Sequence, residues 1–184
     1  MGKIAVHEFI TLDGVFEAPA WTMGYAFDPK MGGALAGIMG SCKGILLGRR
    51  TYQEFAPAWS VRTAEQDPGA PFFNDTPKYV VSETLQSADW NNSTVIGPYS
   101  ADTVADLKKR VDGDLYVSGS GTLVRAMLTD RLIDELHLFV YPLAQGSGQR
   151  LFADGGAPVN FELAGSEAYS SGVMHLTYTP ATAT

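Results

Sequence analysis

An arginine pair and a threonine lie where an apolar strand should give way to a helix. Residues 43–48 are almost wholly apolar, as in a buried parallel strand, and Thr51 and Glu54 have the spacing of a capping box, so a helix should open at Thr51. A helix N-terminus presents unpaired backbone N–H groups, and the guanidinium groups of Arg49 and Arg50 match phosphate oxygens. These residues therefore predict a phosphate site. The alternative is a solvated arginine pair at the end of a strand.

A glycine-rich turn, Gly119-Ser120-Gly121, follows a second predicted strand at 114–118 and precedes a predicted helix. Glycine lets the backbone approach a ligand closely, and the start of a helix again favours phosphate. The turn lacks the spacing of the six-residue dinucleotide fingerprint, and a plain tight turn is the simpler interpretation when it is taken alone. Two such sites in one domain nevertheless fit a dinucleotide, whose phosphates spread across several loops.

Two more polar positions follow predicted strands. Asp13 lies in an Asp13-Gly14 turn just after the strand at 3–10, and Ser82 closes the strand at 78–82. Ligands of open α/β sheets lie beyond the carboxyl ends of the strands, so both residues belong to that edge. Ser82 could instead cap the next turn, and Asp13 could bond its own turn backbone. We interpret Asp13 as the residue that meets the substrate and supplies a proton, with water as the alternative donor.

Aromatic residues are frequent in the predicted loops. Trp21 and Tyr25 lie in the loop-like stretch 17–27, which follows the first strand and its turn. An exposed aromatic ring can stack on a flat ligand, so we expect Trp21 and Tyr25 to contact a substrate, with packing in the core as the alternative.

These positions need a frame of alternating strands and helices. Four helices are expected: one capped by Asp28 and continuing to about residue 41, one opening at Thr51, one capped by Ser100, and one with an apolar face from Leu123. The segment 57–77 has little periodicity and is expected to be a long loop. The eight predicted strands cover 3–10, 43–48, 78–82, 93–97, 114–118, 135–142, 159–165 and 173–179. This order predicts an α/β fold with a mostly parallel sheet and an antiparallel C-terminal edge, in one domain over 1–180 with a flexible tail at 181–184.

Composition excludes several classes of protein. The chain has 184 residues and a formal charge of -7, which disfavours nucleic acid and anionic membranes as partners. A lone cysteine, Cys42, excludes an internal disulfide, and the three scattered histidines show no metal-binding spacing, so no metal is expected. No long apolar run or signal peptide is visible, so the expected location is the cytoplasm.

Taken together, the motifs resemble the dihydrofolate reductase-like superfamily. More closely, they resemble the reductase half of the bifunctional riboflavin-biosynthesis deaminase–reductase and its stand-alone relatives. The resemblance spans residues 3 to about 178. The matching segments are 11–14, 45–52, 78–82, 119–123, 134–136, 141–143 and 146–148.

The resemblance implies an NADPH-binding fold and a role for each motif. Gly48, Arg49, Arg50 and Thr51 would hold the cofactor phosphates, and Ser82 would lie near the adenosine end. The turn formed by Gly119, Ser120, Gly121, Thr122 and Leu123 would cradle the pyrophosphate. The loop formed by Leu12, Asp13 and Gly14 would cover the nicotinamide and face the substrate.

The expected function is therefore NADPH-dependent reduction of a small heterocycle, such as a pterin or a pyrimidine, by hydride transfer. No carboxylate can be placed inside the first helix, where folate reductases carry one, and the deaminase zinc signature is absent. The alternatives are a nucleotide-binding regulatory or interaction module without turnover and, less favoured, a nucleotide-free structural scaffold.

A homodimer is also expected. Related proteins commonly pair, and the predicted strand at 135–142 is apolar at nearly every position, which leaves a face to be covered if it lies near an edge. Trp59, Phe72 and Phe73 add aromatic surface within the predicted loop at 57–77. The alternative is that these side chains fold onto their own domain.

Overall fold

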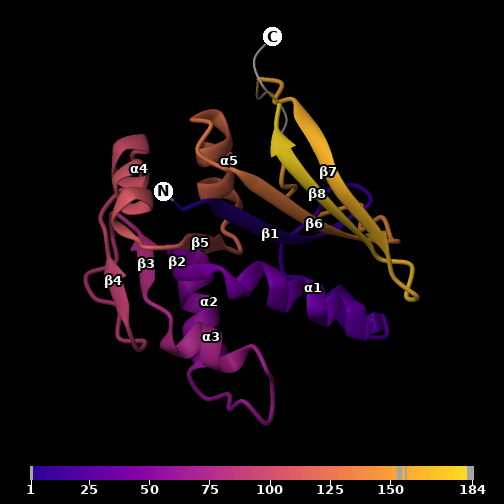
Figure 1. Ribbon diagram of the computed structural model, residues 1–184, viewed down its shortest axis with the longest axis horizontal. Helices are drawn as coiled ribbons and strands as arrows, with labels where there is room; N and C mark the ends of the chain where they lie inside the picture. The colour runs from indigo at the N-terminus through magenta and orange to yellow at the C-terminus, as the bar shows by residue number, and fades with distance from the viewer. Residues whose placement is uncertain (1, 153–154, 156, 182–184) are drawn as a thin grey trace.

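Eight strands form one sheet in the computed structural model, which describes residues 2–152, 155 and 157–181 (Figure 1). The strands are β1 (Ile4–Thr11), β2 (Cys42–Gly48), β3 (Lys78–Val81), β4 (Ser93–Val95), β5 (Asp114–Val117), β6 (Glu135–Tyr141), β7 (Phe161–Ala168) and β8 (Met174–Pro180). They lie in the order β4-β3-β2-β5-β1-β6-β8-β7. The strands from β4 to β6 pair in parallel, whereas β8 pairs in the antiparallel sense with both β6 and β7. The predicted parallel sheet with an antiparallel C-terminal edge is confirmed.

Helices cover both faces of this sheet. The helices are α1 (Pro29–Gly40), α2 (Arg49–Trp59), α3 (Ala70–Asp75), α4 (Ala101–Arg110) and α5 (Gly121–Thr129), with a short 3-10 helix η1 at Ala20–Gly24. In Figure 1, α4 and α5 lie above the sheet, and α1, α2 and α3 lie below it. Each layer has its own apolar core: Val104 and Met127 pack on the first face, and Met31 and Phe73 on the second. This two-sided cover explains why β2 reads as an almost unbroken apolar run.

The start of α2 differs from its prediction. The helix begins at Arg49 with Gly48 at its N-cap, and no side chain caps it, so the predicted capping box of Thr51 and Glu54 is wrong. Thr51 is a buried residue of the first turn instead. The caps predicted for the other two helices are confirmed, because Asp28 accepts a hydrogen bond from the backbone of Lys30 and Ser100 accepts one from Thr103.

The segment 57–77 is more ordered than predicted. Helix α2 continues to Trp59, and α3 adds a fifth helix where the sequence indicated a loop. Lys78 explains why so short a helix is stable here: its buried ammonium group donates to the carbonyl oxygens of Phe73, Asn74 and Thr76 at 2.7–3.1 Å. A helix that ends on unpaired carbonyl groups is stabilised by such a cation.

Two of the arguments for the predicted dimer are wrong. The aromatic residues of 57–77 fold onto their own domain: Trp59 stacks on Phe73 at 4.1 Å between ring centroids, and Phe72 packs against Tyr116. Strand β6 is not near an edge, because β8 and β7 extend the sheet beyond it. The tail predicted at 181–184 lies, apart from Ala181, outside the described residues. No helix within those residues is long and apolar enough to cross a membrane.

Candidate functional site

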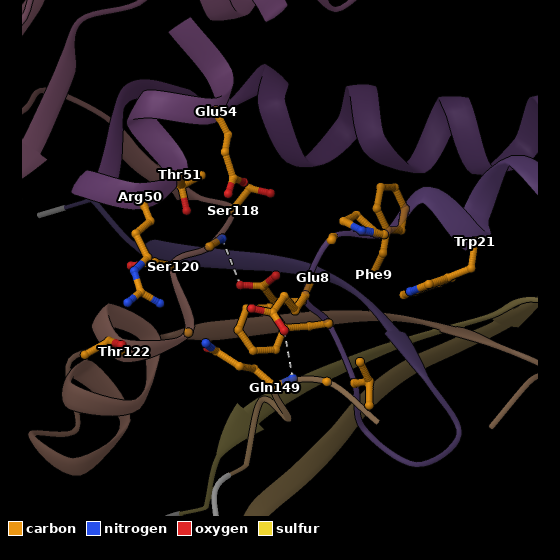
Figure 2. Close-up of a pocket in the computed structure, with 18 of the residues that line it drawn as sticks. Glu8, Phe9, Trp21, Arg50, Thr51, Glu54, Ser118, Ser120, Thr122 and Gln149 are labelled. Atoms are coloured by element: carbon orange, nitrogen blue, oxygen red, sulfur yellow. Dashed lines mark hydrogen bonds between the residues drawn. The ribbon is translucent and has the colours of Figure 1, made fainter. Parts of the chain in front are cut away.

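A cavity of about 650 Å³ opens beyond the carboxyl ends of β1, β2 and β5. Figure 2 shows residues of its wall, which consists of four segments: β1 and the loop after it, helix α2, the turn at 118–122, and the loop at 145–149. Because parallel strands end at one edge, residues far apart in the sequence meet here. This is the edge at which the sequence placed the ligand site.

The two predicted phosphate motifs lie in contact. A Cβ on Gly48 would collide with Ser120 Oγ, and one on Gly119 would lie 2.7 Å from Thr51 Oγ1. Gly119 also has a φ of +66°, which other residues rarely adopt. Glycine is therefore required on both sides of the junction, and the starts of α2 and α5 approach each other at the cavity wall.

The residues predicted to bind cofactor divide into two groups. Those that line the cavity are Arg50, Thr51, Gly119, Ser120, Gly121 and Thr122. In Figure 2, the Arg50 side chain extends from α2 toward Ser120 and Thr122 at the start of α5. These six residues come from two separate motifs, so the fold brings the main part of the prediction together.

The remaining predicted cofactor residues lie off the cavity wall. The Arg49 guanidinium is exposed and donates to Gln53 at 2.9 Å, and Leu123 is buried in the core beneath α5. Ser82 accepts hydrogen bonds from the backbones of Thr84 and Leu85, which is the turn-capping role that the sequence also allowed. Leu12 is 68% exposed, and Leu12 and Gly14 belong to the loop beside the cavity.

Asp13 is held by the backbone of a neighbouring loop. Its carboxylate accepts hydrogen bonds from Thr11 Oγ1 at 2.5 Å and from the backbone nitrogens of Gln145 and Gly146 at 3.0 and 2.8 Å. These donors lower the pKa of Asp13 to about 2. The carboxylate is thus ionised at neutral pH and carries no proton, and it lies outside the cavity lining.

Glu8 is an acid that the sequence interpretation missed. It lies in β1, is 4% exposed, and lines the cavity between Ser118 and Gln149 in Figure 2. Burial raises its pKa to about 8, although a hydrogen bond from the backbone of Gly119 opposes the rise. A glutamate inside a strand of mainly apolar residues is the signal that could have revealed it, because buried acids are rare without a reason.

The two predicted substrate aromatics have different surroundings. Trp21 lines the cavity, and its indole Nε1 is buried without a hydrogen-bond partner among the described residues. Tyr25 does not line the cavity; it packs against Tyr141, with the ring centroids 5.2 Å apart. Phe9, Phe55 and Trp59 supply further aromatic lining. One wall of the cavity is therefore apolar and aromatic, and it includes the indole N–H of Trp21, which has no hydrogen-bond partner among the described residues.

Comparison with known proteins identifies the family to which this architecture belongs. The sequence pattern of the RibD C-terminal domain matches residues 2–175, which is nearly the whole chain. The protein belongs to the RibD C-terminal domain family. The resemblance to the reductase half of the riboflavin-biosynthesis enzyme is thereby confirmed. Within the described residues, no group of three or more histidine, cysteine, aspartate or glutamate side chains could hold a metal ion.

Three known proteins are similar to this chain. The uncharacterized protein YyaP of Bacillus subtilis (strain 168) is 27% identical over 180 residues, covering 96% of this chain and 94% of YyaP. A putative riboflavin biosynthesis protein from Shewanella sp. PV-4 superposes with a TM-score of 0.80 at 20% identity, covering 99% and 100% of the two chains. A dihydrofolate reductase from Enterococcus faecalis, solved with NADP(H), gives 0.60 at 12% identity and coverage of 98% for each chain. The dihydrofolate reductase-like fold is confirmed.

Proposed function

We propose that this RibD C-terminal domain protein is an NADPH-dependent reductase of a small heterocyclic substrate such as a pterin or a pyrimidine. The observation that carries the proposal is the single cavity in which two helix starts, a glycine turn and a buried acid meet. The family and the reductase-type fold support the same class of reaction.

The residues present fit a dinucleotide phosphate. The starts of α2 and α5 offer backbone N–H groups that their helices leave unpaired, and Arg50 adds a positive charge between them. Glycine at 48 and 119 leaves no Cβ where the two motifs meet, so the backbone itself forms the cradle. NADPH bound there would supply the hydride, and the chain would position it against the substrate.

A reduction also needs a proton, and Glu8 is placed to hold one. Its pKa of about 8 keeps the carboxyl group protonated at neutral pH, and the group lines the cavity. Asp13, with a pKa of about 2, has no proton to give under the same conditions. We therefore assign the proton donor role to Glu8. The sequence-based assignment to Asp13 becomes the competing proposal.

The aromatic wall favours a flat substrate. Phe9, Trp21 and Phe55 line the cavity, and a planar heterocycle can stack on aromatic rings of this kind. The indole N–H of Trp21, which has no partner among the described residues, would donate a hydrogen bond to a ring carbonyl oxygen. Because a buried donor without a partner is costly, a carbonyl-bearing ring is the preferred class of substrate.

The test is a search for turnover with the purified protein. NADPH oxidation is followed by loss of its near-ultraviolet absorbance with a panel of pterins, pyrimidines and other conjugated carbonyl compounds. Oxidation that depends on one of these compounds supports the proposal. Tight NADPH binding with no oxidation across the panel would favour the nucleotide-binding module without turnover.

We also propose that the protein forms a homodimer and lies in the cytoplasm. Strand β7 is an edge strand, and its Leu163 side chain is 57% exposed, so apolar surface remains at this side of the sheet. Light scattering should give twice the chain mass of 19.7 kDa at micromolar concentration. A mass near 19.7 kDa that does not rise on concentration would overturn the dimer.

A further inference from the structure

Three arginines surround a second hollow that adjoins the main cavity. The hollow has a volume of about 400 Å³ and shares Arg50 and Thr122 with the cavity wall. Arg125 of α5 and Arg150 of the loop after β6 bring two more guanidinium groups to it. Three cations from three different segments therefore meet at one edge of the proposed reductase site.

The fold fixes two of these guanidinium groups through backbone carbonyls. Arg125 Nη1 donates to the carbonyl oxygen of Arg150 at 3.0 Å, and Arg150 Nε donates to the carbonyl oxygen of Asp13 at 3.0 Å. The Arg125 group also lies beside the start of α5, because its Nη1 is 3.1 Å from where a Cβ on Gly121 would be. A guanidinium carries five N–H donors, so most remain available to a ligand.

The nearby carboxylates of the described residues form no ion pair with these arginines. Asp13 accepts from the backbone nitrogens of Gln145 and Gly146, and Glu17 accepts from that of Gln149 at 3.1 Å. Across 2–152, 155 and 157–181, no carboxylate oxygen lies within 4.0 Å of the charged nitrogens of the three arginines. In a chain of net charge -7, three neighbouring cations that form no ion pair with a described carboxylate attract an anion.

We propose that Arg50, Arg125 and Arg150 form a binding site for a phosphoryl anion at the mouth of the cavity. Each guanidinium fork can bind two oxygens of a phosphate or diphosphate, and Thr122 adds an exposed hydroxyl at the start of α5. The phosphoryl group can belong to either of two ligands: it is the diphosphate bridge of the cofactor or a phosphate on the substrate. The attribution to the cofactor rests on the proposed function, whereas the anion site itself does not.

Inorganic pyrophosphate is the probe, because its binding does not depend on the proposed cofactor. Calorimetric titration of the full chain should show binding that weakens as salt is added. Arg125→Gln and Arg150→Gln should each weaken it about ten-fold, the double variant more, and Arg110→Gln on α4 should leave it unchanged. Absence of pyrophosphate binding at low salt, or equal affinity in the wild type and the double variant, would overturn the site.

Melting temperatures and lysine variants distinguish a loss of binding from a loss of folding. Melting temperatures identify a variant that fails to fold, and in that case Arg125→Lys and Arg150→Lys, which keep the charge but lose the fork, should still weaken pyrophosphate binding. Unchanged affinity in folded lysine and glutamine variants would contradict the proposal.

Titrations with NAD⁺ and NADP⁺ distinguish the source of the anion. Equal losses for both nucleotides in the double variant indicate the diphosphate, which both of them carry. Unchanged nucleotide affinity together with lost pyrophosphate binding keeps the site and assigns it to a substrate phosphate. A wild-type protein that binds pyrophosphate but neither nucleotide would refute the proposed function and leave the anion site standing.

Discussion

Glu8 Oε1 lies 2.8 Å from the backbone nitrogen of Gly119, so a buried acid ties β1 to the glycine turn of the candidate site. This hydrogen bond places one carboxyl oxygen against the turn while the side chain lines the cavity. The carboxyl group thus joins β1 to the turn, and its pKa of about 8 keeps it protonated at neutral pH. Its titration can be measured without knowing the substrate.

Glu8→Gln should stabilise the protein by an amount that grows with pH. The pKa of Glu8 is raised from 4.5 to about 8 in the folded state, so between these values the unfolded chain has lost a proton that the folded chain keeps. The native protein therefore loses stability as pH rises through this window, by up to about 1.4 kcal/mol per pH unit, and glutamine removes the effect while it can still accept from Gly119. Urea unfolding at several pH values measures the difference. A stability difference that stays constant from pH 5 to 8 would show that Glu8 is ionised in the folded protein.

Asp13→Asn should loosen the loop that the carboxylate holds. The variant keeps an acceptor but loses the charge that binds the backbone of Gln145 and Gly146. We expect faster amide exchange at these two positions, with the fold and NADPH affinity preserved. With a substrate identified, turnover should fall less in Asp13→Asn than in Glu8→Gln. The reverse order would return the role of proton donor to Asp13.

The two arginines of α2 should differ in what they contribute to cofactor binding. Arg50 lines the cavity, so Arg50→Ala should weaken NADPH and NADH alike, by about ten-fold. Arg49 lies outside the cavity with an exposed guanidinium group, and we expect this group to contact the 2′-phosphate, which NADH lacks. Arg49→Ala should thus weaken NADPH alone, and fluorescence titration with both nucleotides measures this. Equal losses of affinity for both nucleotides in Arg49→Ala would show that Arg49 does not contact the 2′-phosphate.

Gly121→Ala should damage the site, whereas Gly33→Ala should not. A Cβ at 121 would collide with the ring of Phe16, which lines the cavity, and overpacking of this kind costs about 1–3 kcal/mol. A Cβ at 33 meets nothing within 4 Å on α1, so alanine there should raise stability by up to about 1 kcal/mol. Thermal unfolding and NADPH titration compare the pair. Wild-type NADPH affinity in Gly121→Ala would show that the turn does not approach the cofactor.

The sequence alone determined the frame of this protein. Alternating apolar strands and helices predicted the parallel sheet, and the turn around Gly172 predicted its antiparallel edge, because these signals are local in the chain. The same local reasoning located the motifs at Arg50 and Gly119, whose contact across the cavity wall the structure shows. Two predictions from local signals were wrong because tertiary contacts outweighed those signals. Lys78 stabilises α3 from outside the helix, and Gly48 rather than Thr51 is the N-cap of α2.

Only the tertiary structure decided that Glu8 lines the cavity and that Asp13 does not. In the sequence, Asp13 follows a strand and carries a family motif, while Glu8 lies inside a strand and resembles an isolated exception. In the folded protein, the backbone of the loop at 145–146 donates hydrogen bonds to the Asp13 carboxylate. The Glu8 carboxyl group is instead buried in the sheet against the glycine turn. The charge state of a carboxyl group depends on its burial and on partners from distant segments, and the local spacing of residues in the sequence predicts neither. The gathering of Arg50, Arg125 and Arg150 has the same cause.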